Sequence, residues 1–283
     1  MEREKRDERG AGGDAASLPI GVFDSGLGGL TVVREIRRSL PAEELIYLGD
    51  NARVPYGTRS PATIERYAGN CADFLALQGL KMLVVACNTA SAVALPYLRR
   101  RVAVPVIGVI GAGARSACEA TANHRVGVIG TAGTIGSGAY PREIGALDPE
   151  ARVFQRAAPL LVPLAEEGWT EGDVPRLALE RYLAPLAAEE VDVLLLGCTH
   201  YPLLEGELRG VLAGLGSPAR VINSAQAMAR EVAASLEANG LARAGGERGG
   251  LDCYATDLPE SFQEMAERFL GGPIAAVEKV DIL

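Results

Sequence analysis

The sequence predicts an α/β protein made of two similar domains with mainly parallel sheets. Short, continuously apolar runs recur along the 283 residues, and amphipathic segments with helical spacing separate them. This alternation is typical of parallel strands covered by helices. The composition agrees, because 48% of the residues are hydrophobic but only 5% are aromatic, which suits a core of Ala, Val, Leu and Ile.

Eight of the apolar runs are predicted to be buried strands. In chain order they are LPIGVFD, EELIYLGD, KMLVVAC, VPVIGVI, RVGVIGT, VDVLLLGC, ARVIN and LDCYATD. Helices are predicted between them. In LTVVREIRRSL, the residues Val33, Ile36 and Leu40 follow one helical face, and a second amphipathic helix begins after the start signal of Ser60 and Pro61.

The two halves of the chain resemble each other. VVACNTAS and LLGCTHYP each place a cysteine where a strand ends, and the two cysteines are 111 residues apart, about the length of one domain. We therefore predict a first domain from residues 18–112 and 225–283, a second domain from residues 113–224, and an active site in the cleft between them. Residues 1–17 mix charges with Gly and Ala and are predicted to be a disordered tail.

Composition and charge exclude several classes of protein. The N-terminus lacks the apolar stretch of a signal peptide, and no later segment is apolar enough to span a membrane, so we predict a cytoplasmic protein without a membrane partner. Five scattered cysteines predict reduced thiols rather than a disulfide scaffold. A net charge of −8 argues against direct binding of nucleic acid.

The loops that follow the predicted strands are small and polar. Because parallel sheets bind ligands beyond the carboxyl ends of their strands, five such loops could converge on one cleft. They are DSGLGG, GDNARVPYG, CNTASA, GTAGTIGS and CTHYP.

Two of these loops carry a cysteine near a predicted helix start. Cys87 is followed by Asn88 and Thr89, and Cys198 is followed by Thr199 and His200. A helix N-terminus favours the thiolate and lowers the pKa of such a thiol. A single buried cysteine usually packs as a small hydrophobe, which is the role predicted for Cys71, Cys118 and Cys253.

Three kinds of chemistry are open to this pair of cysteines. His200 could serve Cys198 as the base of a cysteine hydrolase, and a zinc ion could bind Cys87, Cys198, His200 and Asp24. The zinc alternative lacks a compact Cys-x-x-Cys spacing, and two thiols at matching strand ends fit reversible proton transfer better. Asp24 and Ser25 also follow a strand, where Asp24 could assist a base or simply cap the next helix.

The sequence predicts that no cofactor and no metal is needed. Thr31 stands where a dinucleotide-binding loop needs its third glycine, and GAGARS at Gly111 is equally incomplete. A pyridoxal phosphate enzyme needs a lysine in its site. None of Lys5, Lys81 and Lys279 follows a predicted strand.

Taken together, DSGLGGL, GDNARVPYG, CNTASA, GTAGTIGS and LLLGCTHYPLL, between residues 23 and 204, resemble the glutamate racemase family. NSAQ at residues 223–226 resembles a weaker block of that family. The resemblance implies interconversion of L-glutamate and D-glutamate without a cofactor, to supply D-glutamate for peptidoglycan. It also implies a homodimer and, since some members are associated with inhibition of DNA gyrase, an interaction with gyrase.

The resemblance also implies roles for individual residues. Cys87 would act on the D-enantiomer side with help from Asp24, while Cys198 would act on the L side with help from His200 and Glu166. Glu167 is the alternative to Glu166. Contacts with the substrate are implied for Asp24, Ser25, Tyr56, Gly57, Asn88, Thr89, Thr134, Thr199 and His200. These loops offer neutral donors and helix N-termini, rather than Arg or Lys, to the two carboxylates of glutamate.

The chain departs from the commonest family pattern at two positions, with Asn223 where an acidic residue is frequent and Ala158 where a cysteine is frequent. Related enzymes on the same fold are rivals: an aspartate racemase, a maleate isomerase or a decarboxylase. A regulatory protein that binds gyrase and a redox protein that joins Cys87 to Cys198 are rivals of other classes.

Overall fold

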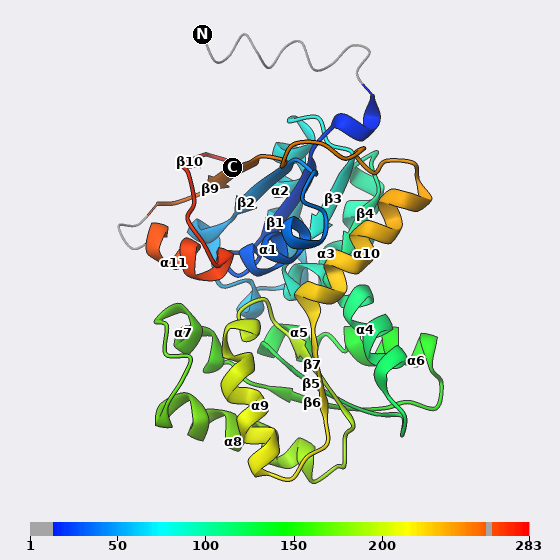
Figure 1. The fold of residues 1–283 in the computed structure, drawn as a ribbon, viewed down its shortest axis with the longest axis vertical. Coiled ribbons are helices and arrows are strands. Elements are labelled where there is room, and N and C mark those ends of the chain that lie inside the picture. The colour runs from blue at the N-terminus through cyan, green and yellow to red at the C-terminus, as the bar shows by residue number, and fades with distance from the viewer. Residues whose placement is uncertain (1–13, 259–261, 283) are drawn as a thin grey trace.

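A computed structural model describes residues 14–258 and 262–282, and it contains two parallel sheets with helices on their faces (Figure 1). The predicted α/β class is confirmed. The sheets lie in separate layers of the molecule, one above the other in Figure 1, and the chain passes from the first to the second and back again. Among the described residues, no helix is both long and apolar enough to cross a membrane.

The first sheet has six strands in the order β10-β9-β2-β1-β3-β4, and every neighbouring pair is parallel. Its strands come from both ends of the chain. They are β1 (Ile20–Asp24), β2 (Leu45–Gly49), β3 (Met82–Val85), β4 (Val106–Gly108), β9 (Leu251–Ala255) and β10 (Val277–Lys279).

The second sheet has four parallel strands in the order β6-β5-β7-β8. All of them come from the middle of the chain. They are β5 (Arg125–Gly130), β6 (Arg152–Ala157), β7 (Val193–Gly197) and β8 (Arg220–Asn223).

Helices connect the strands and cover both sheets, with short 3₁₀ turns in several of the loops. The helices are α1 (Leu30–Ser39), α2 (Pro61–Ala76), α3 (Asn88–Arg101), α4 (Val109–Ala120), α5 (Ala132–Gly136), α6 (Ala139–Leu147), α7 (Leu161–Glu166), α8 (Asp173–Ala187), α9 (Glu205–Gly214), α10 (Ser224–Ala238) and α11 (Phe262–Leu270). The 3₁₀ turns are η2 (Ala15–Ser17), η3 (Asn51–Arg53), η4 (Tyr56–Thr58) and η5 (Tyr201–Leu204).

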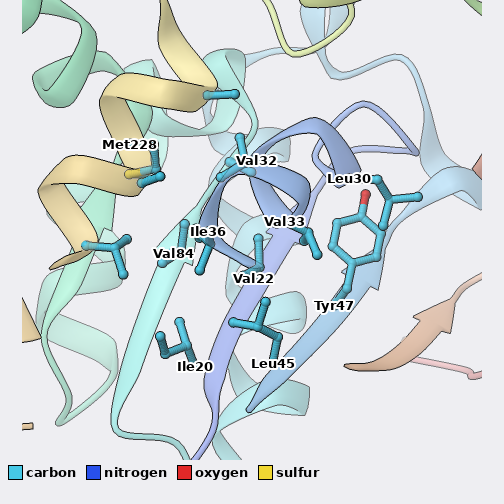
Figure 2. Close-up of a cluster of buried hydrophobic side chains, with 14 of the residues drawn as sticks. Ile20, Val22, Leu30, Val32, Val33, Ile36, Leu45, Tyr47, Val84 and Met228 are labelled. Carbon is cyan, nitrogen blue, oxygen red and sulfur yellow. The ribbon is translucent and has the colours of Figure 1, made fainter. Parts of the chain in front are cut away.

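Side chains along β1 point alternately to the two faces of the first sheet, so a separate hydrophobic cluster lies on each face. Ile20 and Val22 point to one face, where they pack with Ile36 of α1 and Met228 of α10 (Figure 2). Phe23 points to the other face, into the cluster that α2 and α3 cover. Since both faces are buried, the strand is apolar from Ile20 to Phe23, which is why its sequence identifies it.

The predicted start signal of α2 is confirmed, because the Ser60 side chain accepts a hydrogen bond from the backbone N–H of Thr63 and Pro61 opens the helix. Two strands were not predicted. Most of β6 is only half-buried and it carries Arg152, Gln155 and Arg156, while β10 has three residues and is largely exposed. Both are edge strands, which lack the continuous apolar run of a central strand.

Residues 1–13 of the predicted tail lie outside the described residues. The prediction is wrong for residues 14–17, which form part of the fold: Asp14 caps the turn η2, Ala16 is buried, and the Lys81 ammonium donates to the Ala16 carbonyl at 2.6 Å. The predicted boundary after residue 112 falls inside α4, while the boundary after residue 224 falls at the first residue of α10.

Candidate functional site

A cavity of about 300 Å³ lies beyond the carboxyl ends of the strands, and loops from both sheets line it. Loops after β1, β2 and β3 of the first sheet meet loops after β5, β6 and β7 of the second. The lining residues are Ser25, Val54, Pro55, Tyr56, Gly57, Thr58, Cys87, Asn88, Thr89, Thr131, Ala132, Pro159, Val162, Pro163, Glu166, Cys198, Thr199 and His200.

Cys87 is the N-cap residue of α3. Its sulfur accepts the backbone N–H of Ala90 at 3.4 Å, and its thiol donates to the Ser25 hydroxyl at 3.3 Å. Burial and then the charge of Asp24 raise the pKa of the Cys87 thiol to about 12. The expectation that the helix N-terminus lowers this pKa is therefore wrong for Cys87, because burial and the neighbouring carboxylate outweigh the hydrogen bonds. Without a ligand, Cys87 is a thiol at neutral pH.

Cys198 follows β7 and lies beside a cation. Its sulfur is 3.8 Å from Nδ1 of His200, and Nε2 of His200 is 3.1 Å from Oε1 of Glu166. Burial lowers the pKa of His200, but the hydrogen bonds with Cys198 and Glu166 outweigh burial and raise this pKa to about 10. His200 is thus an imidazolium at neutral pH, and its ring lies beside the Cys198 sulfur.

This raised pKa predicts a pH dependence of folding stability. A histidine with a folded-state pKa near 10 and an ordinary value of 6.5 stabilises the fold fully below about pH 6.5, and the contribution is lost as the pH rises through 10. His200→Gln should therefore lower the free energy of unfolding most at pH 6 and least above pH 10. Chemical denaturation of both proteins measures this, and a difference that stays constant with pH would contradict it.

Asp24 lies behind the cavity rather than on its surface. It is buried, one carboxylate oxygen accepts the N–H of Gly26 at 3.0 Å, and the other accepts the Thr199 hydroxyl at 3.5 Å. Burial raises the pKa of Asp24, and the charge of His200 opposes this shift. Asp24 therefore reaches the cavity through Thr199 and through its charge on Cys87.

Thr31, the residue that breaks the dinucleotide pattern, joins the two sheets. Its buried hydroxyl lies 2.8 Å from the carbonyl of Gly28 and 3.0 Å from the carbonyl of Thr199. Gly28 itself leaves no room for a side chain, since a Cβ there would lie 2.2 Å from the Thr199 hydroxyl oxygen and 2.6 Å from Nδ1 of His200. The loop after β1 is thus shaped to fit against the Thr199–His200 turn.

Helix α11 packs against the site on the side of His200. The rings of His200 and Phe269 meet edge to face, with 5.0 Å between their centroids. The neighbouring Arg268 donates from its guanidinium to the carbonyl of Glu166. In Figure 1, α11 lies next to α7, so a helix near the end of the chain supports the Glu166–His200 pair.

Threonines form a connected group at the other side of the cavity. Thr89 lies 3.2 Å from Thr131 and 3.3 Å from Thr134, measured between hydroxyl oxygens, and Thr131 is the N-cap of α5. Thr134 is fully buried and does not line the cavity, so its part is to hold Thr89 and Thr131. The N-cap position in GTAGTIGS could have identified Thr131, which sequence analysis missed.

Tyr56 and Gly57 line the cavity from the turn η4. The buried hydroxyl of Tyr56 donates to the carboxylate of Asp50, and Arg53 donates to both oxygens of the same carboxylate, at 2.9 and 2.7 Å. Gly57 faces Gly133 of α5, where a Cβ on Gly133 would lie 2.6 Å from the Gly57 carbonyl oxygen. The backbone of η4 and the backbone of α5 therefore lie in close contact at this edge of the cavity.

Three apolar lining residues, Pro159, Val162 and Pro163, were not predicted. They follow β6, the edge strand that the sequence did not reveal, so no strand end pointed to them.

The geometry gives no support to the zinc alternative. Within the described part of the chain, no three His, Cys, Asp or Glu side chains lie together as metal ligands, so the zinc alternative has no ligand set. All five cysteines are free thiols, including Cys87 and Cys198.

Comparison with known proteins identifies the family of this chain. The Asp/Glu/hydantoin racemase family model matches residues 20–232. A glutamate racemase from Geobacter metallireducens is 49% identical over 93% of this chain and 96% of its own length. A crystal structure of glutamate racemase from Francisella tularensis in complex with D-glutamate has a TM-score of 0.87 and 36% identity, covering 94% of this chain and 98% of that one.

A crystal structure of Escherichia coli glutamate racemase in complex with L-glutamate and the activator UDP-MurNAc-Ala is also similar. Its TM-score is 0.74 at 34% identity, and the match covers 94% of this chain and 99% of that one. The family match, the relatives and the cavity with its two cysteines agree, and this chain belongs to the Asp/Glu/hydantoin racemase family.

Proposed function

We propose that this protein is a glutamate racemase, an isomerase that interconverts L-glutamate and D-glutamate by passing the α-proton through Cys87 and Cys198. One observation carries the mechanism: two thiols, each following a strand of a different sheet, line the same cavity. Glutamate is supported as the substrate by the 49% identical relative and by the similar structures that contain D-glutamate and L-glutamate.

The cavity suits an anion with two carboxylates. Apart from the two cysteines, its only charged groups among the described lining residues are Glu166 and the imidazolium of His200, and the other polar groups are neutral. Asn88 and Thr89 stand in the first turn of α3, where backbone N–H groups and the helix dipole favour a carboxylate. The Nδ2 group of Asn88 is buried without a hydrogen-bond partner in the described structure, so it is a free donor for one carboxylate oxygen.

The two cysteines have different neighbours, which suits them to opposite roles. Cys87 holds its proton, while the sulfur of Cys198 lies beside the imidazolium of His200. With L-glutamate bound, Cys198 takes the α-proton from one face and becomes a thiol. Cys87 then gives its own proton to the opposite face of the carbanion and becomes a thiolate, which yields D-glutamate. The reverse reaction starts from the opposite protonation of the two sulfurs.

The remaining residues support these steps. His200 assists Cys198, and the 3.1 Å contact of Glu166 with His200 favours Glu166 over Glu167 as the carboxylate that orients the ring. Asp24 stabilises the proton on Cys87 and orients Thr199. Direct contacts with glutamate are proposed for Ser25, Tyr56, Gly57, Asn88, Thr89, Thr199 and His200, with Thr134 acting through Thr89.

The wider role follows from the proposed reaction. D-Glutamate made in the cytoplasm would supply peptidoglycan synthesis and thereby cell shape. A homodimer is supported by large apolar side chains that stay exposed between residues 160 and 177, namely Leu160, Trp169, Val174 and Leu177. Light scattering of the purified protein measures this state.

Isotope exchange tests the proposed two-base mechanism. Unlabelled L-glutamate is incubated in D2O with enzyme that has been dialysed against a chelator and given no pyridoxal phosphate. The thiol of Cys87 exchanges with solvent between turnovers, so early D-glutamate should carry deuterium at the α-carbon. The recovered L-glutamate should stay largely unlabelled. Chiral chromatography with mass spectrometry measures both pools.

Three other outcomes would each contradict one part of the proposed function. Early D-glutamate that retains α-protium would show one mobile base instead of two thiols. Activity lost on dialysis and restored by zinc or pyridoxal phosphate would contradict cofactor independence, which we infer because the described lysines lie outside the cavity: Lys81 pairs with buried Glu43 and Lys279 with Asp257. Turnover of aspartate but not glutamate would replace the proposed substrate.

A further inference from the structure

Tyr140, in the first turn of α6, connects the second sheet to the cavity. Its side chain is fully buried, and its hydroxyl donates to Oδ1 of Asn88 at 2.8 Å. Asn88 is the first residue of α3, the helix that follows β3 of the first sheet, so this bond crosses between the two halves of the molecule. Tyr140 itself is not among the residues that line the cavity.

Two glycines make room for the ring of Tyr140. A Cβ on Gly197 of β7 would lie 2.9 Å from Cε2 of the ring, and a Cβ on Gly113 of α4 would lie 3.3 Å from the hydroxyl oxygen. Gly197 directly precedes Cys198. The ring is therefore enclosed by backbone close to the site, and its hydroxyl is held in one place.

The hydrogen bond from Tyr140 fixes the orientation of the Asn88 side-chain amide. A hydroxyl that donates to Oδ1 holds this oxygen on the Tyr140 side, so the amide nitrogen takes the other side of the group. This nitrogen is buried and has no hydrogen-bond partner in the described structure. Because an unpaired buried donor is costly, the arrangement favours a bound group that accepts this hydrogen bond.

We propose that Tyr140 is a positioning residue, which orients the Asn88 amide so that Nδ2 donates to a carboxylate of the bound substrate. The inference rests on the proposed function, since the acceptor is a carboxylate of glutamate. Tyr140 touches no substrate and acts through Asn88. Without the hydroxyl, the amide is free to turn its oxygen toward the carboxylate, which replaces an attractive contact with a repulsive one.

Tyr140→Phe tests this role, because it removes the hydroxyl and keeps the ring. Loss of one hydrogen bond to a charged group should raise KM for both L-glutamate and D-glutamate about tenfold, with kcat changed by less than about threefold. Chiral chromatography of initial rates in each direction measures both constants. An unchanged KM would overturn the proposal.

Tyr201→Phe is the matched control. Tyr201 is equally buried, and its hydroxyl donates to the backbone carbonyl of Ala158 at 2.9 Å rather than to a residue of the cavity. The two variants should lose similar thermal stability, but only Tyr140→Phe should raise KM. An equal rise in both would show a general loss of packing and overturn the proposal.

A double-mutant cycle separates positioning from a structural effect. Asn88→Ala should raise KM, and adding Tyr140→Phe should raise it no further, because Tyr140 then has no amide to orient. Additive increases would overturn the proposal. If Tyr140→Phe does not fold, Asn88→Asp replaces it. The carboxylate of this variant still accepts the Tyr140 hydroxyl but offers no donor, so KM should rise at least as much as expected for Tyr140→Phe. An unchanged KM would overturn the proposal.

Failure of this inference is distinct from failure of the proposed function. If the unaltered protein does not racemise glutamate, the proposed function is wrong. If the unaltered protein racemises glutamate and Tyr140→Phe has the same KM, the proposed function stands and only the role of Tyr140 is wrong.

Discussion

Replacing either Cys87 or Cys198 by serine is expected to lower the rate of racemisation by about 10³-fold in both directions, the scale typical of general acid–base groups. A hydroxyl is a far weaker base than a thiolate, so neither proton transfer is replaced. Both thiols line the cavity, and serine is slightly smaller than cysteine, so the fold should persist. Initial rates with each enantiomer and thermal unfolding of each variant measure these effects.

Cys118→Ser is the matched control for these two variants. Cys118 is partly buried on α4, its nearest polar partner is the carbonyl of Ile144 at 3.9 Å, and it does not line the cavity. Its replacement should leave the rate within about twofold. If Cys87→Ser or Cys198→Ser retains a substantial rate while folded, this cysteine has no part in proton transfer.

Gly28→Ala is expected to lower kcat/KM by about 10²-fold with a small loss of stability. The added methyl group would collide with the Thr199 hydroxyl and with Nδ1 of His200, at 2.2 and 2.6 Å. These are side-chain atoms, so they can move aside without disrupting the core, but both belong to the site. A displacement of about 1 Å in a site costs about this much in rate.

Gly26→Ala provides the comparison, two residues earlier in the same loop. A Cβ at Gly26 meets nothing closer than Val54 at 3.8 Å, and alanine keeps the backbone N–H that Asp24 accepts. Its kcat/KM should stay within about twofold. Equal losses in the two variants would mean that the loop as a whole, rather than the fit of Gly28 against His200, controls the rate.

The central strands and both cysteines could be predicted because their signals are local. β1, β3 and β7 are buried on both faces, so each is an unbroken apolar run, and the polar loop after it marks the site. Cys87 and Cys198 stand at such strand ends, and both line the cavity.

What could not be predicted depends on contacts between distant segments. The pKa of Cys87 is set by burial and by Asp24, 63 positions earlier, and these reverse the shift that its helix N-terminus alone predicts. Tyr140 lies in an ordinary helical segment, and nothing in its neighbourhood along the chain indicates that its hydroxyl meets Asn88. The apolar lining residues Pro159, Val162 and Pro163 were missed because β6, the edge strand before them, lacks an apolar signature.

The place of β9 has a consequence for synthesis on the ribosome. β9 pairs with β2, yet it follows all four strands of the second sheet in the chain. A nascent chain that has finished its second sheet still carries β2 with one bare hydrogen-bonding edge, and such edges invite pairing with other chains. The N-terminal half is made first and completed last, so a translating chain depends on its final segment, or on a chaperone, to cover that edge.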